Sequence, residues 1–301
     1  MVQRAAMNEQ ELYADDWMEV GWSEWLSLDP ADGDLPTISS DPGLYRVRHC
    51  DRDGLEYIGE TGRSTRGRVG ALARNVYSDE MPFRDPHTAA PCLWAVRDRY
   101  GSEFEVSTTT PPLAKDDQNR KGLETALIAI ARREMGKSPT ANFGRIIDGY
   151  SQSSYRKDGY VGGPLEDGET EPNAEPGRGP VSWENVDDVT ARDWMGLEWS
   201  EPYRLADRLE PKLPDAGVYR IWLEGDTSPL AYIGETSAFT GRLRRHEKTF
   251  GGEARFAVAT PEGMDAKHKR TEVETDLIGV HYLVHGRSPL AQFGNGDAIL
   301  Q

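Results

Sequence analysis

The chain has no long apolar run and very little cysteine. Its longest uninterrupted apolar stretch, Ala126 to Ala131, is far shorter than the roughly 18 residues that a membrane-spanning helix requires. The two cysteines, Cys50 and Cys92, lack the Cys-x-x-Cys and Cys/His spacings of zinc sites, and they are too few for a disulfide framework. Met1 to Arg4 leads into polar sequence rather than a signal peptide. We therefore expect a cytoplasmic protein with no membrane partner.

Positive charge is also scarce, which argues at first against a nucleic-acid partner. The 301 residues hold 35 Lys and Arg against 51 Asp and Glu, a net charge of −16, whereas affinity for phosphates comes from Lys and Arg. The acidic excess is local, because residues 1–41 hold ten acids and residues 158–192 hold nine. Residues 42–75 hold seven Arg against four acids, and residues 236–250 hold four basic residues against one acid. An anionic partner is expected at these two basic stretches.

The sequence contains a duplication. The pentapeptide Tyr-Ile-Gly-Glu-Thr occurs at 57–61 and again at 232–236. Each copy follows a second shared motif, Gly43-Leu44-Tyr45 in the first half and Gly217-Val218-Tyr219 in the second. The length and the repeat together predict two domains of ordinary size.

Tryptophans precede each copy of the repeat. Asp-Trp-Met at 16–18 and Trp-Ser-Glu at 22–24 return at 193–195 and 199–201, a constant offset of 177 residues. Such tryptophans either stack on nucleic-acid bases or pack the start of each domain onto its own sheet. Packing is the interpretation that we favour.

Composition divides the chain into three parts. The predicted domains cover residues 1–149 and 191–301, and the acidic, Gly- and Pro-rich stretch between them, 150–190, resembles a linker. Such a composition predicts an extended and exposed segment. The alternative is an ordered strap anchored by its three tyrosines, Tyr150, Tyr155 and Tyr160.

Hydrophobic periodicity predicts the same order of elements in both halves. Two strands joined by a short turn come first, at 44–49 and 55–60 and again at 218–223 and 230–235. An amphipathic helix, a segment with strand character and a long closing helix follow. The expected fold class is α+β, with a small, mainly antiparallel three-stranded sheet flanked by helices in each half.

The two halves differ in their middle segment. Strand character falls at Arg255 to Ala259 in the second half, and at Leu93 to Arg97 and Phe104 to Ser107 in the first. The distance from the tyrosine of Tyr-Ile-Gly to the glutamate of the closing helix is 67 residues in the first half and 42 in the second. The first half therefore carries 25 extra residues, roughly Ser78 to Asp117. We expect a surface loop there, with contact to a substrate as the alternative.

The Gly-apolar-Tyr and Tyr-Ile-Gly motifs, about ten residues apart, resemble the signature of the GIY-YIG nucleases, and they do so in both halves. The resemblance implies an endonuclease that hydrolyses the phosphodiester bonds of double-stranded DNA with Mg²⁺ or Mn²⁺. In that family a tyrosine is taken as the general base, an arginine as the phosphate clamp and a glutamate as the single metal ligand. The lack of an appended DNA-binding motif points to a restriction-like or defence-related enzyme.

Carried over to this chain, the resemblance implies one site in each half. The second half offers Tyr219, Tyr232, Arg242, His246 and Glu274. The first half offers Tyr45, Tyr57, Arg68, Glu124 and Asn142. Glu274 and Glu124 are the implied metal ligands.

Each half departs from the family pattern at an auxiliary position. The first has Leu72 where the family has a helix histidine, and its Arg68 lies one residue further along the chain. The second has Gln292 where the family has asparagine. The alternative function is therefore a DNA-binding or assembly protein with one or both modules catalytically silent, and a nickase if only one is active.

The residues themselves suit phosphodiester hydrolysis, which needs a proton acceptor for water, a cation near the phosphate and help for the leaving oxygen. Each half supplies one candidate for each task. Because both sets lie in one chain, a monomer could cut both strands. Glu60 and Glu235 of the pentapeptide are either extra metal ligands or partners of the hairpin, and we favour the second interpretation.

Overall fold

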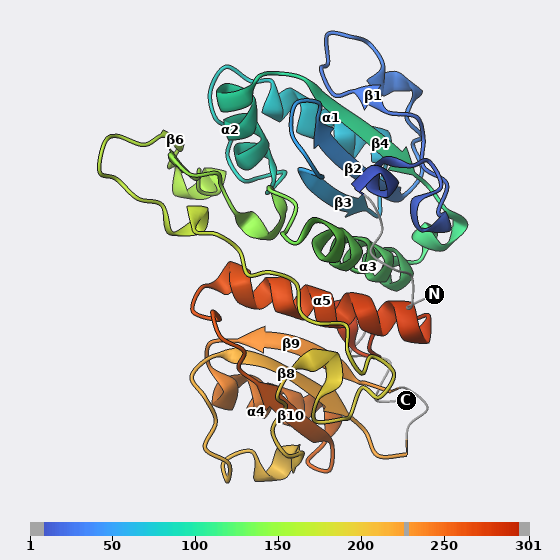
Figure 1. The fold of residues 1–301 in the computed structure, drawn as a ribbon, viewed down its shortest axis with the longest axis vertical. Coiled ribbons are helices and arrows are strands. Elements are labelled where there is room, and N and C mark those ends of the chain that lie inside the picture. Colours follow the sequence, from blue (N-terminus) through green and yellow to red (C-terminus); the bar gives the residue numbers. More distant parts are fainter. Residues whose placement is uncertain (1–8, 226–228, 295–301) are drawn as a thin grey trace. The chain divides into compact units, whose positions relative to one another are not determined.

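The structure is a computed structural model that describes residues 9–225 and 229–294. The chain divides into two compact units. Of the described residues, 9–120 and 134–177 form the N-terminal unit, and 121–133, 178–225 and 229–294 form the C-terminal unit. The predicted α+β fold class is confirmed, since each unit contains a four-stranded antiparallel sheet flanked by helices (Figure 1).

The sheet of the N-terminal unit has the strand order β1-β4-β2-β3. In the central strand, Tyr45 pairs with Gly59 on one side and with Thr108 on the other. The strands are β1 (Leu26–Ser27), β2 (Gly43–His49), β3 (Tyr57–Thr61) and β4 (Phe104–Thr109).

Two helices, α1 (Thr65–Val76) and α2 (Ala90–Tyr100), pack on the face of this sheet that carries Tyr45. Ser64 begins α1, because its side chain accepts the Gly67 N–H as an N-cap. The longer helix α3 (Asp117–Met135) starts in the N-terminal unit, and its residues 121–133 belong to the C-terminal unit.

The sheet of the C-terminal unit has the equivalent order β7-β10-β8-β9. Its strands are β7 (Tyr203–Arg204), β8 (Gly217–Trp222), β9 (Tyr232–Thr236) and β10 (Arg255–Ala259). Its helices are α4 (Phe239–Phe250) and α5 (Lys267–His285).

Alternation along β8 gives the sheet two different faces. Tyr219 belongs to the apolar cluster that includes Leu243 of α4. Val218 belongs to the cluster on the other face, which includes Val273 of α5. The predicted site residues Tyr219 and Arg242 therefore share the α4 face.

On the face away from the tyrosines, each sheet holds a buried arginine beside tryptophans. Arg46 is 0% exposed and lies 4.4 Å from the ring centroid of Trp22, and it donates to three main-chain carbonyls. Arg220 is 1% exposed and lies 4.2 Å from the ring of Trp199, again with three carbonyl acceptors. The packing interpretation is confirmed for the buried tryptophans, Trp17, Trp22, Trp194 and Trp199.

The strands differ from the sequence-based prediction in two ways. Each sheet has four strands rather than three, because the segments after the tryptophans add the two-residue strands β1 and β7. Leu93 to Arg97 lies inside α2 and is not a strand. This helix is buried along most of its length, so its apolar run has no helical polar face, and a short apolar run of that kind does not distinguish helix from strand.

The extra residues of the first half form a loop and a helix. From the end of α1 at Val76 to the start of β4 at Phe104 the chain advances 104 − 76 = 28 positions, against 255 − 250 = 5 between α4 and β10. The loop and α2 are packed into the core, with Met81 and Leu93 buried, so the expected surface loop is not what the structure has.

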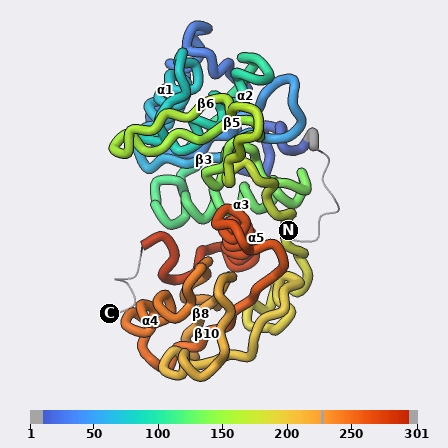
Figure 2. The backbone as a smooth tube through the Cα atoms, turned by 90° about the vertical axis from the view of Figure 1, so that its left-hand side faces the viewer, coloured from blue at the N-terminus to red at the C-terminus, as the bar shows by residue number. Residues whose placement is uncertain are grey.

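The segment 150–190 is exposed over much of its length, as its composition indicates, but it has ordered structure and buried side chains at both ends. Its first part forms the hairpin of β5 (Tyr150–Ser151) and β6 (Gly163–Pro164), drawn as a tube in Figure 2. Tyr150 is buried and donates to Asp98, whereas Tyr155 and Tyr160 are exposed. The last part contributes buried side chains to the C-terminal unit, namely Val181, Val186 and Val189.

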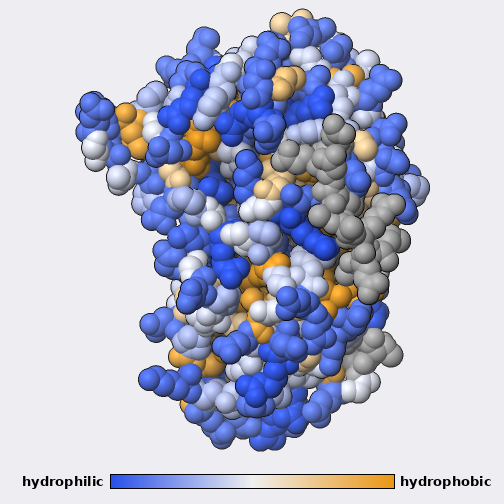
Figure 3. All heavy atoms as spheres, viewed as in Figure 1, coloured by the Kyte–Doolittle hydropathy of each residue, from blue (hydrophilic) through white to orange (hydrophobic). Residues whose placement is uncertain are grey.

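Among the described residues, no helix is both long enough and apolar enough to cross a membrane. The face of the molecule drawn in Figure 3 is largely hydrophilic, with apolar residues gathered in small areas.

Candidate active sites

In the C-terminal unit the two predicted tyrosines meet over a glycine. Tyr219 of β8 lies opposite Gly234 of β9, and its ring centroid is 6.0 Å from that of Tyr232, with 23° between the planes. A Cβ atom at Gly234 would overlap the Tyr219 hydroxyl. The glycine of Tyr-Ile-Gly is therefore required, because any side chain would displace the phenols.

Tyr45 and Tyr57 repeat this arrangement in the N-terminal unit. Their ring centroids are 5.8 Å apart, and a Cβ atom at Gly59 would lie 2.8 Å from both hydroxyls. Both tyrosines are buried here, whereas Tyr232 in the other unit is half-buried. The first site is thus the more enclosed of the two.

A histidine completes the cluster in the C-terminal unit. His246 follows Arg242 by one turn of α4, and its Nε2 lies 2.9 Å from the Tyr219 hydroxyl. Its ring centroid is 4.6 Å from that of Tyr232. Burial, with Arg242 and Arg245 as lesser causes, lowers the pKa of His246 to about 4. The imidazole is therefore neutral near pH 7 and able to exchange a proton with the phenol.

The N-terminal unit also has an imidazole on its first tyrosine, from a residue that the sequence analysis missed. His87 lies in the extra loop before α2, and its Nε2 is 2.6 Å from the Tyr45 hydroxyl. Its ring centroid is 5.4 Å from that of Tyr57. Leu72, at the helix position where the family has histidine, is fully buried in the core instead.

The two predicted arginines lie on the first helix of each site. Arg242 is half-buried, and no ion pair of its guanidinium occurs among the described residues. Burial, and after it the charge of Glu274, raises the pKa of Tyr232, whereas the charge of Arg242 lowers it. The Arg242 guanidinium is therefore close enough to act on the Tyr232 phenol. Arg68 is also half-buried and donates from Nη1 to the Pro86 carbonyl at 2.7 Å. Each arginine retains donors for an anion.

Glu274 is the carboxylate of the C-terminal site. It lies on α5, and its Oε1 accepts the main-chain N–H of Glu235 at 3.2 Å. Burial, and after it the charge of Glu235, raises the pKa of Glu274 to about 7. A nearby cation would favour its ionised form.

Glu124 is the corresponding residue of α3 and is half-buried. It lies in the part of α3 that belongs to the C-terminal unit, whereas Tyr45, Tyr57, Arg68 and Asn142 belong to the N-terminal unit. The N-terminal unit by itself therefore brings together four of the five residues predicted for the first site.

The glutamates of the two Tyr-Ile-Gly-Glu-Thr copies each pair with a buried arginine. Arg270 Nε donates to Glu235 Oε2 at 2.9 Å, and Arg120 Nε donates to Glu60 Oε2 at 2.5 Å. Each arginine precedes the predicted metal glutamate by four residues on the same helix. These contacts are those of a residue that holds the hairpin to the closing helix, which supports the structural interpretation of Glu60 and Glu235.

Asn142 and Gln292 make the same kind of contact in the two units. The Asn142 amide accepts the Ile58 N–H at 3.0 Å and donates to the Ile58 carbonyl at 2.9 Å. The longer Gln292 accepts the Ile233 N–H at 3.2 Å. Both side chains thus pair with the outer strand beside the phenols, and the change from asparagine to glutamine preserves the hydrogen bond from the strand N–H.

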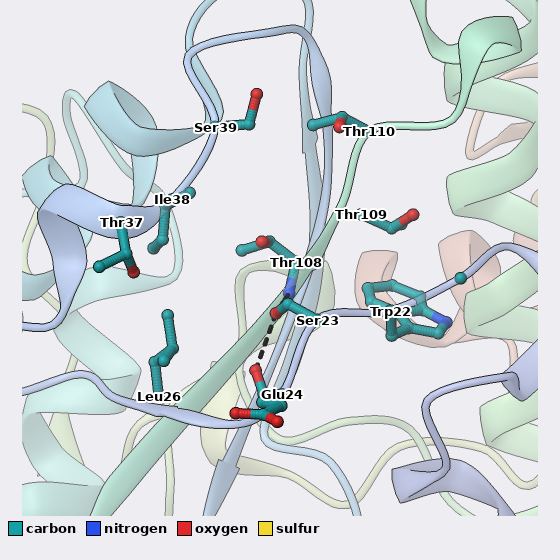
Figure 4. A pocket seen from close by; sticks show the side chains of 11 residues that line it. Trp22, Ser23, Glu24, Leu26, Thr37, Ile38, Ser39, Thr108, Thr109 and Thr110 are labelled. Carbon is teal, nitrogen blue, oxygen red and sulfur yellow. Dashed lines mark hydrogen bonds between the residues drawn. The ribbon is translucent and has the colours of Figure 1, made fainter.

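A groove lies in the N-terminal unit between the tryptophan segment and the end of β4 (Figure 4). Two of its hydroxyl groups are engaged within the protein, since Ser23 Oγ accepts the Thr108 N–H at 2.9 Å and Thr109 Oγ1 donates to the Val20 carbonyl at 2.8 Å. No histidine or arginine lines it. We therefore place the chemistry at the tyrosine clusters.

No family model, curated protein or solved structure matches the chain. Within the described residues, no group of three or more His, Cys, Asp or Glu side chains is arranged to hold a metal ion. The donor set nevertheless fits Mg²⁺, which takes one or two protein carboxylates and fills its remaining positions with water and phosphate oxygens. Glu274, beside Arg242, is such a carboxylate.

Proposed function

We propose that this chain is a GIY-YIG-type endonuclease that hydrolyses phosphodiester bonds in double-stranded DNA. The observation that carries the proposal is a cluster of two tyrosines and a histidine that occurs once in each unit. The phenol hydroxyl lies 2.6 Å from the imidazole nitrogen in the Tyr45–His87 pair and 2.9 Å in the Tyr219–His246 pair. Two independent histidines, one on a helix and one in a loop, converge on the same phenol position. A purely structural role gives no reason for that convergence.

The proposed reaction assigns one task each to the tyrosine, the arginine and the glutamate. The tyrosine phenol first releases its proton to solvent. The phenolate then takes a proton from water, and the water oxygen attacks phosphorus. The bond from phosphorus to O3′ breaks, and O3′ takes up a proton, which leaves a 5′-phosphate and a 3′-hydroxyl. Arg242 or Arg68 donates to the non-bridging oxygens. A divalent cation at Glu274 or Glu124 would neutralise the charge that develops on the phosphate.

The α4 surface supports a DNA partner despite the acidic composition. Arg244, Arg245 and Lys248 are exposed on this helix, next to the half-buried Arg242. Cations gathered beside the candidate site provide phosphate contacts where the reaction needs them. The acidic stretches lie elsewhere in the sequence.

Plasmid cleavage tests the proposal. We expect the protein to convert supercoiled plasmid into nicked and linear forms with Mg²⁺ or Mn²⁺ but not with EDTA. The double variant Glu124→Gln, Glu274→Gln should be inactive while remaining folded, with a melting temperature no lower than that of the wild type. Undiminished cutting in excess EDTA, or by the double variant, would refute the metal-dependent mechanism.

The second candidate function is a nuclease in which only the C-terminal site cleaves DNA. It is favoured by the burial of the N-terminal site. Tyr45 and His87 are both 0% exposed, whereas His246 is half-buried. In this case the enzyme is a nickase, and Glu274→Gln alone abolishes all cleavage. Residual nicking by Glu274→Gln would contradict this candidate.

The biological setting is also a proposal. We infer a cytoplasmic, restriction-like or defence-related enzyme that acts as a monomer, because both residue sets lie in one chain. Light scattering on the active protein tests the monomer. Cleavage of plain, methylated and phosphorothioated DNA side by side tests the restriction-like role, for which we expect one of the three to be cut preferentially.

A further inference from the structure

We propose that His87 occupies, in the N-terminal site, the place beside the first phenol that His246 occupies in the C-terminal site, and that His87 donates a hydrogen bond to the Tyr45 oxygen. The inference rests on the proposed function and adds a residue from a segment that the second half lacks. His87 acts through Tyr45 and is therefore a positioning residue.

The geometry of the two imidazoles is equivalent. Nε2 is the contacting atom in both, at 2.6 Å from Tyr45 and 2.9 Å from Tyr219. Each imidazole also lies against the second tyrosine of its pair, with ring centroids 5.4 Å and 4.6 Å apart. The chain positions are unrelated, since His87 is 42 residues from its tyrosine and His246 is 27 residues from its own.

The direction of the His87 hydrogen bond follows from its other nitrogen. Nδ1 accepts the main-chain N–H of Ala89 at 3.4 Å. Because a neutral imidazole carries one proton, that proton is on Nε2 and points to the Tyr45 oxygen. Burial, with Arg68 as the lesser cause, lowers the pKa of His87 to about 3 and keeps the ring neutral. A donor at this position stabilises the phenolate that general-base catalysis needs.

The loop that carries His87 is held at several points. Ser78 accepts hydrogen bonds at its carbonyl from Trp94 Nε1 and Arg97 Nη2, at 2.9 Å and 2.8 Å. At the other end, Arg68 donates to the Pro86 carbonyl, which joins the predicted phosphate clamp to the residue before His87. The loop therefore presents the imidazole in a fixed place, as a helix does for His246.

The helix position could not serve in this unit. Leu72 is 0% exposed and packs with Val69 and Val76 in the core beneath α1 and α2. An imidazole there would be surrounded by apolar side chains, at the cost of an unpaired buried polar group. The groups that face His87 are Tyr45 from β2, Tyr57 from β3 and Arg68 from α1.

The test uses a background in which only the first site can act. In Glu274→Gln protein, His87→Leu removes the donor at similar size, and His87→Gln retains an N–H donor. We expect His87→Leu to slow nicking about tenfold or more, and to move the rising limb of the pH–rate profile upward by about one unit, because the phenolate forms less readily. His87→Gln should recover most of the rate and the original limb.

Two controls keep the outcome decisive. His285→Gln, at the end of α5 in the C-terminal unit, should leave rate and profile unchanged. Melting temperatures report folding of every variant. If His87→Leu does not fold, His87→Ala takes its place. An unmoved pH limb in the donor-free variant would overturn the inference, and so would equal losses with Leu and Gln.

Ionisation of Tyr45 gives a readout that does not depend on turnover. NMR of ring-¹³C-labelled tyrosine, with Tyr45→Phe for assignment, should show a higher midpoint pH for Tyr45 in His87→Leu than in the parent. If the Glu274→Gln parent does not nick DNA but the midpoint pH of Tyr45 still rises in His87→Leu, the first site is not a nuclease. The role of His87 on Tyr45 would then still hold. An identical midpoint in both proteins would overturn the role of His87.

Discussion

Glu274 is the residue at which stability and the proposed chemistry oppose each other most directly. Burial and the neighbouring Glu235 raise its pKa from 4.5 to about 7. The folded chain therefore holds a proton in this window that the unfolded chain has released. The free energy of unfolding should accordingly fall as the pH rises from 4.5 to 7, and it should stay low above that pH unless a cation is bound.

Glu274→Gln should therefore stabilise the protein at pH 8 without metal, by about 1–3 kcal/mol, and have little effect at pH 4. Urea unfolding at the two pH values measures the difference. Glu198→Gln, at an exposed position of the same unit, is the matched control and should be neutral at both. Equal effects of Glu274→Gln at both pH values would show that its carboxyl ionises normally.

Glu235→Gln separates the two interpretations of the pentapeptide glutamate. The charge of Glu235 is the second cause of the raised pKa of Glu274, so its removal should lower that pKa. Binding of Mn²⁺, followed by calorimetry against pH, should then reach half its maximum at a lower pH than in the wild type. If Glu235 is a ligand instead, binding weakens at every pH.

At the residue level, the candidate residues that belong to short motifs could be predicted from the sequence. The histidine in the extra loop could not. The tyrosines, Arg242 and His246 follow from spacing within one hairpin and one helix. His87 could not be found this way, because it lies 42 residues from Tyr45 in a loop without periodicity. The signal available in the sequence was a histidine in the segment that only the first half has.

At the level of elements, the alternation of β2 and β8 places the tyrosines of the candidate sites and the buried arginines on opposite faces of each sheet. Tyr45 and Tyr219 point to the first helix, and the next residues, Arg46 and Arg220, point to the tryptophans. The repeat of strand order was predictable from the duplicated motifs. The short strands β1 and β7 were not, because two residues are too few to show a period of two.

Arg220→Ala should destabilise the C-terminal unit by about 3–5 kcal/mol, because it leaves three main-chain carbonyls unpaired in a buried site. Burial lowers the pKa of Arg220 to about 9, so the guanidinium is charged at neutral pH and strengthens these hydrogen bonds. Chemical unfolding measures the loss. Arg244→Ala, on the exposed surface of α4, should change stability by less than about 0.5 kcal/mol. If both variants lose a similar amount of unfolding free energy, Arg220 does not have this structural role.

At the scale of the whole molecule, the duplication places two proposed sites in one polypeptide. The two sets of site residues differ in where the histidine lies. It is on α4 in the C-terminal unit and in the extra loop in the N-terminal unit. They are equal in their tyrosines, their arginine and the strand contact of Asn142 or Gln292. A pair of linked sites can make two cuts without a second chain, because the tether keeps the second site at high effective concentration.

Glu124→Gln and Glu274→Gln should therefore each convert a double-strand cutter into a nicking enzyme, with nicks on opposite strands of a mapped plasmid. Each substitution removes the charge that would hold a cation at one site and leaves the residues of the other unchanged. Run-off sequencing from the two strands reads the outcome. Mixing the two variants at equal concentration is the control, since a monomeric enzyme should recover linear product more slowly from the mixture than from the wild type. If Glu124→Gln linearises plasmid at the wild-type rate, the first site is not catalytic and its module has a binding or assembly role.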